Sequence, residues 1–169
     1  MHFSRFATHL LALSLAAFLA GCGFQPRGAL TLPEGFGPLA VTAADPYSPL
    51  ADGLRTDLSR AGAATSTQAD GTAQLRILAE RWETRPLSVD AFVQVREVET
   101  RYAVDFELVD AAGTKRLDKQ TLELSREYVY EAAESFGNPG EQEIIQRELR
   151  RDMQAAVLRR VDIALRGSD

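Results

Sequence analysis

Two segments of the chain space their apolar residues as amphipathic helices do. The first covers Leu50–Ala61; Ser48-Pro49 supplies an N-cap and a proline at the first helical position, and Gly62 is placed to end the helix. The second opens with a similar cap at Asn138–Glu141 and ends at Gly167. The apolar stripes are Leu50, Leu54, Leu58 and Ala61 in the first helix, and Ile145, Leu149, Met153, Ala156, Val157, Val161 and Leu165 in the second.

Other segments alternate apolar and polar residues, as half-buried strands do. A short strand is expected at Leu39–Ala43 and a longer one at Ala73–Trp82. Pro86 either ends this longer strand or marks a sheet edge, because proline cannot donate to a strand ladder. A further strand is expected at Thr121–Tyr130.

The longest β-like stretch covers residues 89–110, and its alternation changes partway. Odd-numbered residues are apolar up to Val95, and even-numbered residues are apolar from Val98 onward. One inserted residue explains such a change, so we expect a β-bulge or a turn near Arg96–Glu97. The opposite side of this stretch exposes a charged row made of Glu97, Glu99, Arg101, Asp105 and Glu107. Such a row is also what an ordinary solvated sheet face shows.

The order of elements is strand, helix, three strands, helix. Two amphipathic helices of this kind need a sheet on which to bury their apolar stripes. The sequence therefore predicts an α+β fold of two layers, in which a four-stranded, mostly antiparallel sheet carries both helices on one face. We place this single domain at residues 39–166, after a glycine- and proline-rich tether at residues 22–38.

The first 21 residues have the features of a secretory signal peptide. Arg5 precedes a run of small and apolar residues, 10–20, that is too short to cross a membrane. Leu19-Ala20-Gly21-Cys22 resembles the bacterial lipobox, which implies cleavage before Cys22 and attachment of lipid to its thiol. Gly23 stands where an aspartate would retain the lipoprotein at the inner membrane, so we expect an outer-membrane location.

Composition narrows the chemistry once this cleavage is taken into account. The chain has 169 residues, a formal net charge of −5, one cysteine and two histidines, His2 and His9. Cleavage removes both histidines and turns the thiol into an anchor, which excludes catalytic units and metal sites built on histidine or free cysteine. We predict no catalytic residues, no metal and no cofactor. An acidic chain also argues against nucleic acid as the partner.

Several short motifs occur together in an order that identifies a family. Cys22–Gly28 follows the lipobox, Ser48–Leu50 starts the first helix, Glu99–Tyr102 leads into the long strand, and Arg126–Tyr128 precedes the last helix. In this order the chain resembles the LptE family of lipopolysaccharide-assembly lipoproteins. The resemblance implies a two-helix, four-strand fold that plugs the outer-membrane barrel LptD, helps to assemble it, and takes part with it in delivering lipopolysaccharide to the outer leaflet. It implies no catalysis.

Binding of an anionic glycolipid by an acidic chain requires a local basic cluster. Arginine suits phosphate because its planar fork binds two oxygens, and 17 of the 19 basic residues are arginine, which a GC-rich genome also explains. The predicted lipopolysaccharide-binding residues are Arg76, Arg81, Arg85 and Arg96. For the last helix we expect ion pairs of Arg147, Arg150, Arg151, Arg159 and Arg160 with Glu143, Glu148 and Asp152.

Two other functions remain open from the residues. One is a lipid-anchored scaffold or transport-auxiliary subunit of another envelope complex that does not bind lipopolysaccharide. The other is a glycan hydrolase that uses carboxylates alone, which requires two acids about 5–10 Å apart in a cleft. The aromatic side chains on the strands, Trp82, Tyr102, Tyr128 and Tyr130, fit either core packing or contact with a partner.

Overall fold

A computed structural model describes residues 38–63, 71–89, 95–129 and 139–167. The predicted signal peptide, 1–21, lies outside these residues. So do Cys22 and the predicted tether apart from Pro38. For Arg96 the structure describes the backbone alone.

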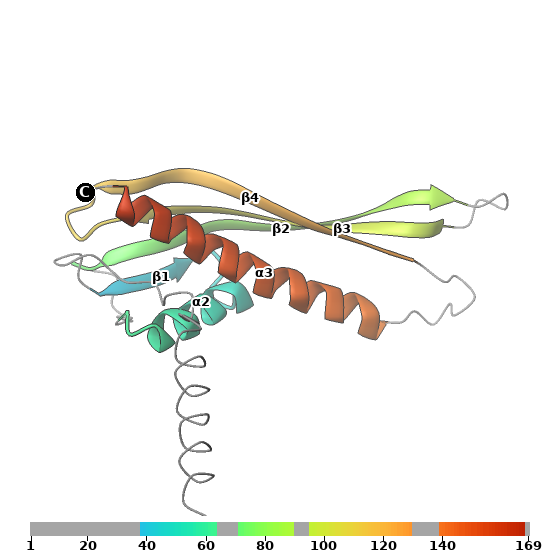
Figure 1. The fold of residues 1–169 in the computed structure, drawn as a ribbon, viewed down its shortest axis with the longest axis horizontal. Helices are drawn as coiled ribbons and strands as arrows, with labels where there is room; N and C mark the ends of the chain where they lie inside the picture. Colours follow the sequence, from blue (N-terminus) through green and yellow to red (C-terminus); the bar gives the residue numbers. More distant parts are fainter. Residues whose placement is uncertain (1–37, 64–70, 90–94, 130–138, 168–169) are drawn as a thin grey trace, which may run out of the picture.

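The described residues form one sheet covered by two helices. The elements in chain order are β1 (Leu39–Ala43), α2 (Pro49–Arg60), β2 (Ala73–Val89), β3 (Val95–Val109), β4 (Lys115–Val129) and α3 (Pro139–Arg166). The strands lie in the order β1-β2-β3-β4; β1 is parallel to β2, and the other neighbours are antiparallel. Both helices lie on the same face of the sheet (Figure 1). The predicted element order and fold class are confirmed.

Helix α2 begins and ends where its capping residues predict. The Ser48 hydroxyl accepts a hydrogen bond from the Ala51 backbone N–H at 3.0 Å, and Pro49 occupies the first helical position. Gly62 follows the helix with φ +74°, a conformation that costs glycine little because it has no Cβ. Leu50, Leu54 and Leu58 are fully buried against the sheet.

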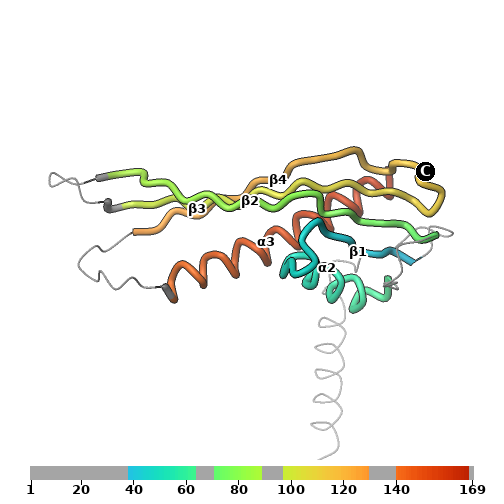
Figure 2. The backbone as a smooth tube through the Cα atoms, turned by 180° about the vertical axis from the view of Figure 1, so that it is seen from behind, coloured from blue at the N-terminus to red at the C-terminus, as the bar shows by residue number. Residues whose placement is uncertain are grey.

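Helix α3 is the longest element, with 28 residues, and it packs on β3 and β4. Its C-terminal part lies close to β4, whereas its N-terminal part diverges from the strands (Figure 2). The predicted stripe is buried at Leu149, Met153, Val157, Val161 and Leu165, and half-buried at Ile145 and Ala156. The centre of the core lies between this stripe, α2, and the inward side chains Leu75, Tyr102, Val104 and Phe106.

Strand β2 is longer than predicted, because it continues through Pro86 to Val89. Strand β1 pairs only with its first part, from Ala73 to Ile77. Beyond Ile77, β3 is the single neighbour of β2 among the described strands, so the edge of β2 that faces away from β3 has no strand there. The missing N–H of Pro86 therefore breaks no hydrogen-bond ladder on that edge. Pro86 therefore marks an edge, and the alternative that it ends the strand is wrong.

The stretch at 89–110 is not one strand, since Val89 belongs to β2 and β3 begins at Val95. The predicted irregularity is present in the pairing of these strands. Ser88 pairs with Glu97 and Val89 pairs with Val95, so Arg96 is the extra residue in the register. The predicted bulge near Arg96–Glu97 is confirmed.

Strand β4 begins at Lys115, well before the predicted Thr121. The preceding turn is organised by Asp110, whose carboxylate accepts the backbone N–H groups of Ala112 and Thr114 at 3.0 and 2.8 Å. Gly113 takes φ +84° in this turn. The first part of β4 is mostly polar and exposed, so it lacks the apolar alternation that marks a half-buried strand.

Candidate binding surface on the outer face of the sheet

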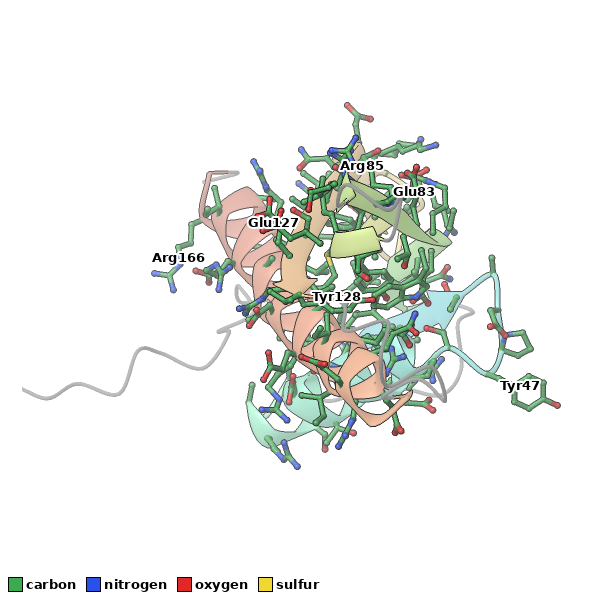
Figure 3. The ribbon with its side chains drawn as sticks, turned by 90° about the vertical axis from the view of Figure 1, so that its right-hand side faces the viewer. Tyr47, Glu83, Arg85, Glu127, Tyr128 and Arg166 are labelled. Carbon is green, nitrogen blue, oxygen red and sulfur yellow. The ribbon has the colours of Figure 1, made fainter. Side chains whose placement is uncertain are left out.

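The face of β2, β3 and β4 that points away from both helices carries a dense array of charged side chains; we call it the outer face. Figure 3 shows Glu83 and Arg85 on this side of the sheet and Tyr128 on the helix side. Side chains alternate between the two faces along each strand, and the pairing register brings the charged side chains of neighbouring strands side by side on this face. The outer face includes Arg76, Arg81, Glu83 and Arg85 of β2, Glu99, Arg101, Asp105 and Glu107 of β3, and Lys115, Lys119, Thr121 and Glu123 of β4.

Asp105 is the most heavily bonded carboxylate of the outer face. Arg81 binds both of its oxygens through two terminal nitrogens, at 2.8 and 3.0 Å. Thr121 donates its hydroxyl at 2.8 Å, and the Lys119 ammonium lies 3.0 Å away. These partners, Arg81 first, hold the pKa of Asp105 far below its ordinary value. The same bonds raise the pKa of Arg81.

Glu107 lies two residues further along β3 and bridges the same two neighbouring strands. Lys115 of β4 lies 3.0 Å from one of its oxygens, and Arg76 of β2 lies 3.4 Å from the other. Lys115 is the main cause of a lowered pKa at Glu107, with Arg76 second among the favourable contacts. Arg76 also donates its Nε–H to Gln74 at 2.8 Å.

Glu99 is the third bridging carboxylate and lies nearer the start of β3. Arg101 and Arg85 donate to one of its oxygens at 2.8 and 2.6 Å. Arg101 is the largest cause of its lowered pKa. Arg101 also lies 3.4 Å from Glu123 of β4, so this group has two basic and two acidic members.

The three carboxylates on β3 are not a solvated row. Glu99, Asp105 and Glu107 are only 6%, 5% and 7% exposed, and each has two basic side chains beside it. The basic partners stay much more accessible: the side chains of Lys115 and Lys119 are 54% and 57% exposed. The reading of this face as an ordinary solvated surface is wrong for these carboxylates.

Three of the four predicted binding residues lie together on the outer face of β2. Arg76, Arg81 and Arg85 each form an ion pair with a carboxylate of β3. Arg96 lies in the bulge at the start of β3, and its side chain is outside the described residues. Lys115 and Lys119, the only lysines of the chain, contact two of the same carboxylates and were not among the predicted residues. Both lie at the start of β4, just after the turn at residues 110–114, and that position was the available signal.

The predicted ion pairs along α3 are only partly present. Arg147 pairs with Glu143 at 3.8 Å, as the spacing predicts. Asp152 instead pairs with Arg126 of β4 at 2.9 Å, which ties the helix to the sheet edge. Arg150 also turns to the sheet, where its guanidinium lies 5.5 Å from the centre of the Trp82 ring.

Aromatic side chains on the helix side of the strands contribute to the core. The rings of Trp82 and Tyr102 stack with centres 3.9 Å apart, and Tyr102 is fully buried. The Tyr102 hydroxyl donates to Glu80, which also accepts the Ser48 hydroxyl at the start of α2. Burial is the main reason that the pKa of Tyr102 is raised. Core packing is therefore confirmed for Tyr102, whereas Trp82, which is 36% exposed, stacks on it at the edge of the core.

The outer face does not have the chemistry of a carboxylate hydrolase. That mechanism needs one carboxyl group held protonated near neutral pH. The basic neighbours of Glu99, Asp105 and Glu107 lower all three pKa values, which keeps these groups ionised. Across the described ranges, no three metal-ligating side chains converge on one point. None of the helices in those ranges is long and apolar enough to span a membrane.

Comparison with known proteins identifies the family. The model of the LptE family, described as lipopolysaccharide-assembly, matches residues 36–161, from just before β1 into the last turns of α3. This chain belongs to the LptE family. A curated relative, the LPS-assembly lipoprotein LptE of Photorhabdus laumondii, is 39% identical over 74 residues. The match covers 44% of this chain and spans only 39% of that relative's length.

Solved structures share the fold of this LptE family member. The rare lipoprotein B of Shewanella oneidensis superposes with a TM-score of 0.65 at 21% identity, covering 74% of this chain and 93% of the other. Lipoprotein B of Nitrosomonas europaea gives a TM-score of 0.69 at 25% identity, covering 83% and 90% of the two chains. The arrangement of one sheet and two helices is thus common to these lipoproteins.

Proposed function

We propose that this LptE family member is a non-enzymatic, lipid-anchored protein of the outer membrane that plugs and helps to assemble the lipopolysaccharide-translocating barrel LptD. Family membership across residues 36–161 is the observation that carries the proposal. The lipobox supports an anchor at Cys22, and Gly23 supports the outer membrane as its destination. Together with the barrel, the protein takes part in delivering lipopolysaccharide to the outer leaflet.

The outer face is physically suited to a barrel lumen. Such a lumen presents polar side chains, and a plug must bury its own surface against them. Burying an unpaired charge is costly, whereas a charge that already has a hydrogen-bonded partner brings much of its compensation with it. Glu99, Asp105 and Glu107 have such partners before any barrel is present.

Affinity purification from detergent-solubilised outer membrane tests the proposed partner. A tag at the C-terminus, after α3, leaves the lipobox intact. We expect a large barrel protein to co-purify with the tagged lipoprotein in equal amounts. Recovery of the lipoprotein without any barrel protein at that yield would refute the proposal.

We further propose that basic side chains contact lipopolysaccharide, namely Arg76, Arg81 and Arg85 of the outer face together with Arg96. The test is binding of lipopolysaccharide to the purified protein after charge reversal at Arg81, Arg85 and Arg96. Reversal at the exposed α3 residues Arg151, Arg159 and Arg160 is the matched control, since it changes the net charge equally. Binding should weaken in the first variant alone; equal binding by both would show that the arginines of β2 and β3 are the wrong residues.

A wild-type protein that binds no lipopolysaccharide would instead favour the alternative, a lipid-anchored scaffold or transport-auxiliary subunit of another envelope complex. The observation that favours this alternative is that Arg76, Arg81 and Arg85 already have carboxylate partners within the protein. If the barrel co-purifies but the wild-type protein binds no lipopolysaccharide, the proposed assembly role stands and the proposed direct contact with lipopolysaccharide is refuted.

A further inference from the structure

The sheet is incomplete along one edge of β2. Strand β1 pairs only with Ala73–Ile77, and beyond that point no other described strand lies on this side of β2 (Figure 1). Pro86 limits the far end of the stretch, since proline has no N–H to donate to a neighbouring strand. The open edge, as we call residues 78–85, therefore has room for a strand of about eight residues, which exceeds the usual length of five or six.

The open edge is exposed, although the strand next to it is buried. Every residue from 81 to 87 is exposed, whereas Val98 and Thr100 of β3, which pair with this part of β2, are buried. The exposed residues include large apolar side chains: Leu78 is 37% exposed and Trp82 is 36% exposed. A strand edge that combines unpaired backbone groups with apolar side chains is a template for another strand.

Alternate residues of the open edge direct their backbone N–H groups away from β3. Pro86 has no N–H and still pairs with Val98, so at that position the N–H side of the backbone faces the edge. The register is unbroken from Ala79 to Pro86, so Trp82 and Thr84 have the same backbone orientation as Pro86. The N–H and C=O groups of these two residues are therefore placed to pair with an added strand.

The geometry disfavours two of the possible occupants of the open edge. The chain enters β1 at Leu39, opposite Ala73, which is the end of β1 furthest from the open edge. An earlier segment of the same chain would have to run back along β1, where the Arg55 side chain already donates to the Val41 carbonyl. Antiparallel pairing of two copies, centred on the open edge, would place residues 87–89 of each copy where β1 of the other copy pairs with β2.

We infer that the open edge binds an extended segment of a separate polypeptide by strand addition. On the proposed function, on which this step rests, that polypeptide is the barrel. The wall strands of a closed barrel are already paired on both edges, so the segment is a loop or a chain end that enters the lumen. Backbone hydrogen bonds supply the affinity in a complex of this kind, and side chains at alternate positions supply the specificity.

The side chains beside the open edge specify the chemistry of the segment. On the outer face, Arg81 and Arg85 already pair with carboxylates of β3, and the exposed Glu83 lies between them in the sequence; Figure 3 shows Glu83 and Arg85 on the same side of the sheet. A basic side chain of the segment fits opposite Glu83. On the helix side, Trp82 is only partly covered by Tyr102, which suits an apolar side chain. The segment therefore has basic and apolar side chains on opposite sides.

Hydrogen exchange of backbone amides, followed by mass spectrometry, tests strand addition. The samples are the full-length lipoprotein alone and its complex with the barrel, both in a non-ionic detergent. Exchange in the peptide that covers the open edge should slow by about tenfold or more in the complex, because its outward N–H groups gain acceptors. Thr84→Pro removes one outward N–H, as Pro86 does naturally, and should reduce this slowing to less than about threefold. Thr84→Val is the matched control, since it also loses the hydroxyl that contacts Thr100 but keeps the N–H.

A second variant leaves the backbone of β2 unchanged. Glu83→Arg reverses the charge that a basic side chain of the segment would meet, so the slowing should decrease in this complex as well. Its control is Glu127→Arg, which makes the same change at an exposed residue of β4 and should match wild type. Both comparisons are made within the open-edge peptide, and exchange in peptides from α2 and α3 shows that each variant is folded.

The outcomes separate this inference from the proposed function. Equal exchange at the open edge in the free lipoprotein and in the complex would overturn the inference and leave the proposed function standing. Equal slowing in the Thr84→Pro and Thr84→Val complexes would also overturn it. So would slow exchange in the free lipoprotein, which assigns the edge to a second copy if dilution speeds the exchange, and to another segment of the same chain if it does not. A wild-type preparation without the barrel would refute the proposed function and this inference together.

Discussion

Removing either hydroxyl that donates to Glu80 should destabilise the fold, and removing both should cost more than the sum. Glu80 lies half-buried on the helix side of β2 and accepts hydrogen bonds from Ser48 at the start of α2 and from Tyr102 of β3. Each bond to a charged group contributes about 1.5–3 kcal/mol. The change Tyr102→Phe should therefore reduce the free energy of unfolding by about 1.5–3 kcal/mol.

The change Ser48→Ala removes two interactions at once. Ser48 also caps α2 by accepting the Ala51 N–H, and loss of such a cap costs about 1 kcal/mol. Adding the bond to Glu80 gives about 2.5–4 kcal/mol. In the double variant the half-buried carboxylate has neither hydroxyl donor, and such a charge is more costly than one with a single remaining donor. The double variant should therefore lose at least about 0.5 kcal/mol more than the sum of the two single changes.

Urea unfolding at neutral pH, followed by circular dichroism, measures these differences. Fluorescence is less suitable because Trp82, the single tryptophan, stacks on Tyr102. Ser59→Ala is the matched control on α2, since Ser59 is exposed, and it should change stability by less than about 0.5 kcal/mol. A Ser48→Ala loss of about 1 kcal/mol or less, or additive effects in the double variant, would show that Glu80 does not join α2 to the sheet.

Three other outcomes follow. Folding lowers the pKa values of Asp105 and Glu107, so the stabilisation that these carboxylates give is complete above their ordinary pKa of about 4 and is lost as pH falls below it. Lys119→Gln removes one cause of the lowered pKa of Asp105, so the midpoint of acid unfolding should shift to higher pH. Gly62→Ala should cost about 1–2 kcal/mol in urea unfolding because φ is +74° there. Met153→Ala should cost about 2–5 kcal/mol in the same assay, since Met153 is fully buried.

The helices were predictable because their signals are local. A cap, a proline and an apolar stripe within one segment fix where α2 begins, and Ser48 caps it as expected. The strands were predictable only where one side is buried. The start of β4 at Lys115 was missed because a polar, exposed strand has the composition of a loop, and its place in the sheet depends on its pairing with β3.

The partners of the charged residues could not be predicted, because they depend on register between strands that are distant in the sequence. Arg81 meets Asp105 through antiparallel pairing that also contains a bulge between Ile77 and Ala79. A slip of one residue would move Arg81 to the helix side. The sequence indicated that basic residues cluster near β2, but only the register shows that β4 contributes Lys119 to the same carboxylate.

This register also meets two demands of the proposed plug role on one surface. Such a plug needs charges that tolerate burial against a polar wall, and it needs an outermost layer that stays polar toward that wall. Pairing each β3 carboxylate with two cations from different strands meets both, because the carboxylate compensates part of the charge while the longer basic side chains remain outermost. In the group around Glu99 the positive and negative charges are equal in number, which suits burial against the polar wall of a barrel lumen. Around Asp105 and Glu107 the lysines of β4 add a surplus of positive charge, so the charge balance of the outer face changes along β3.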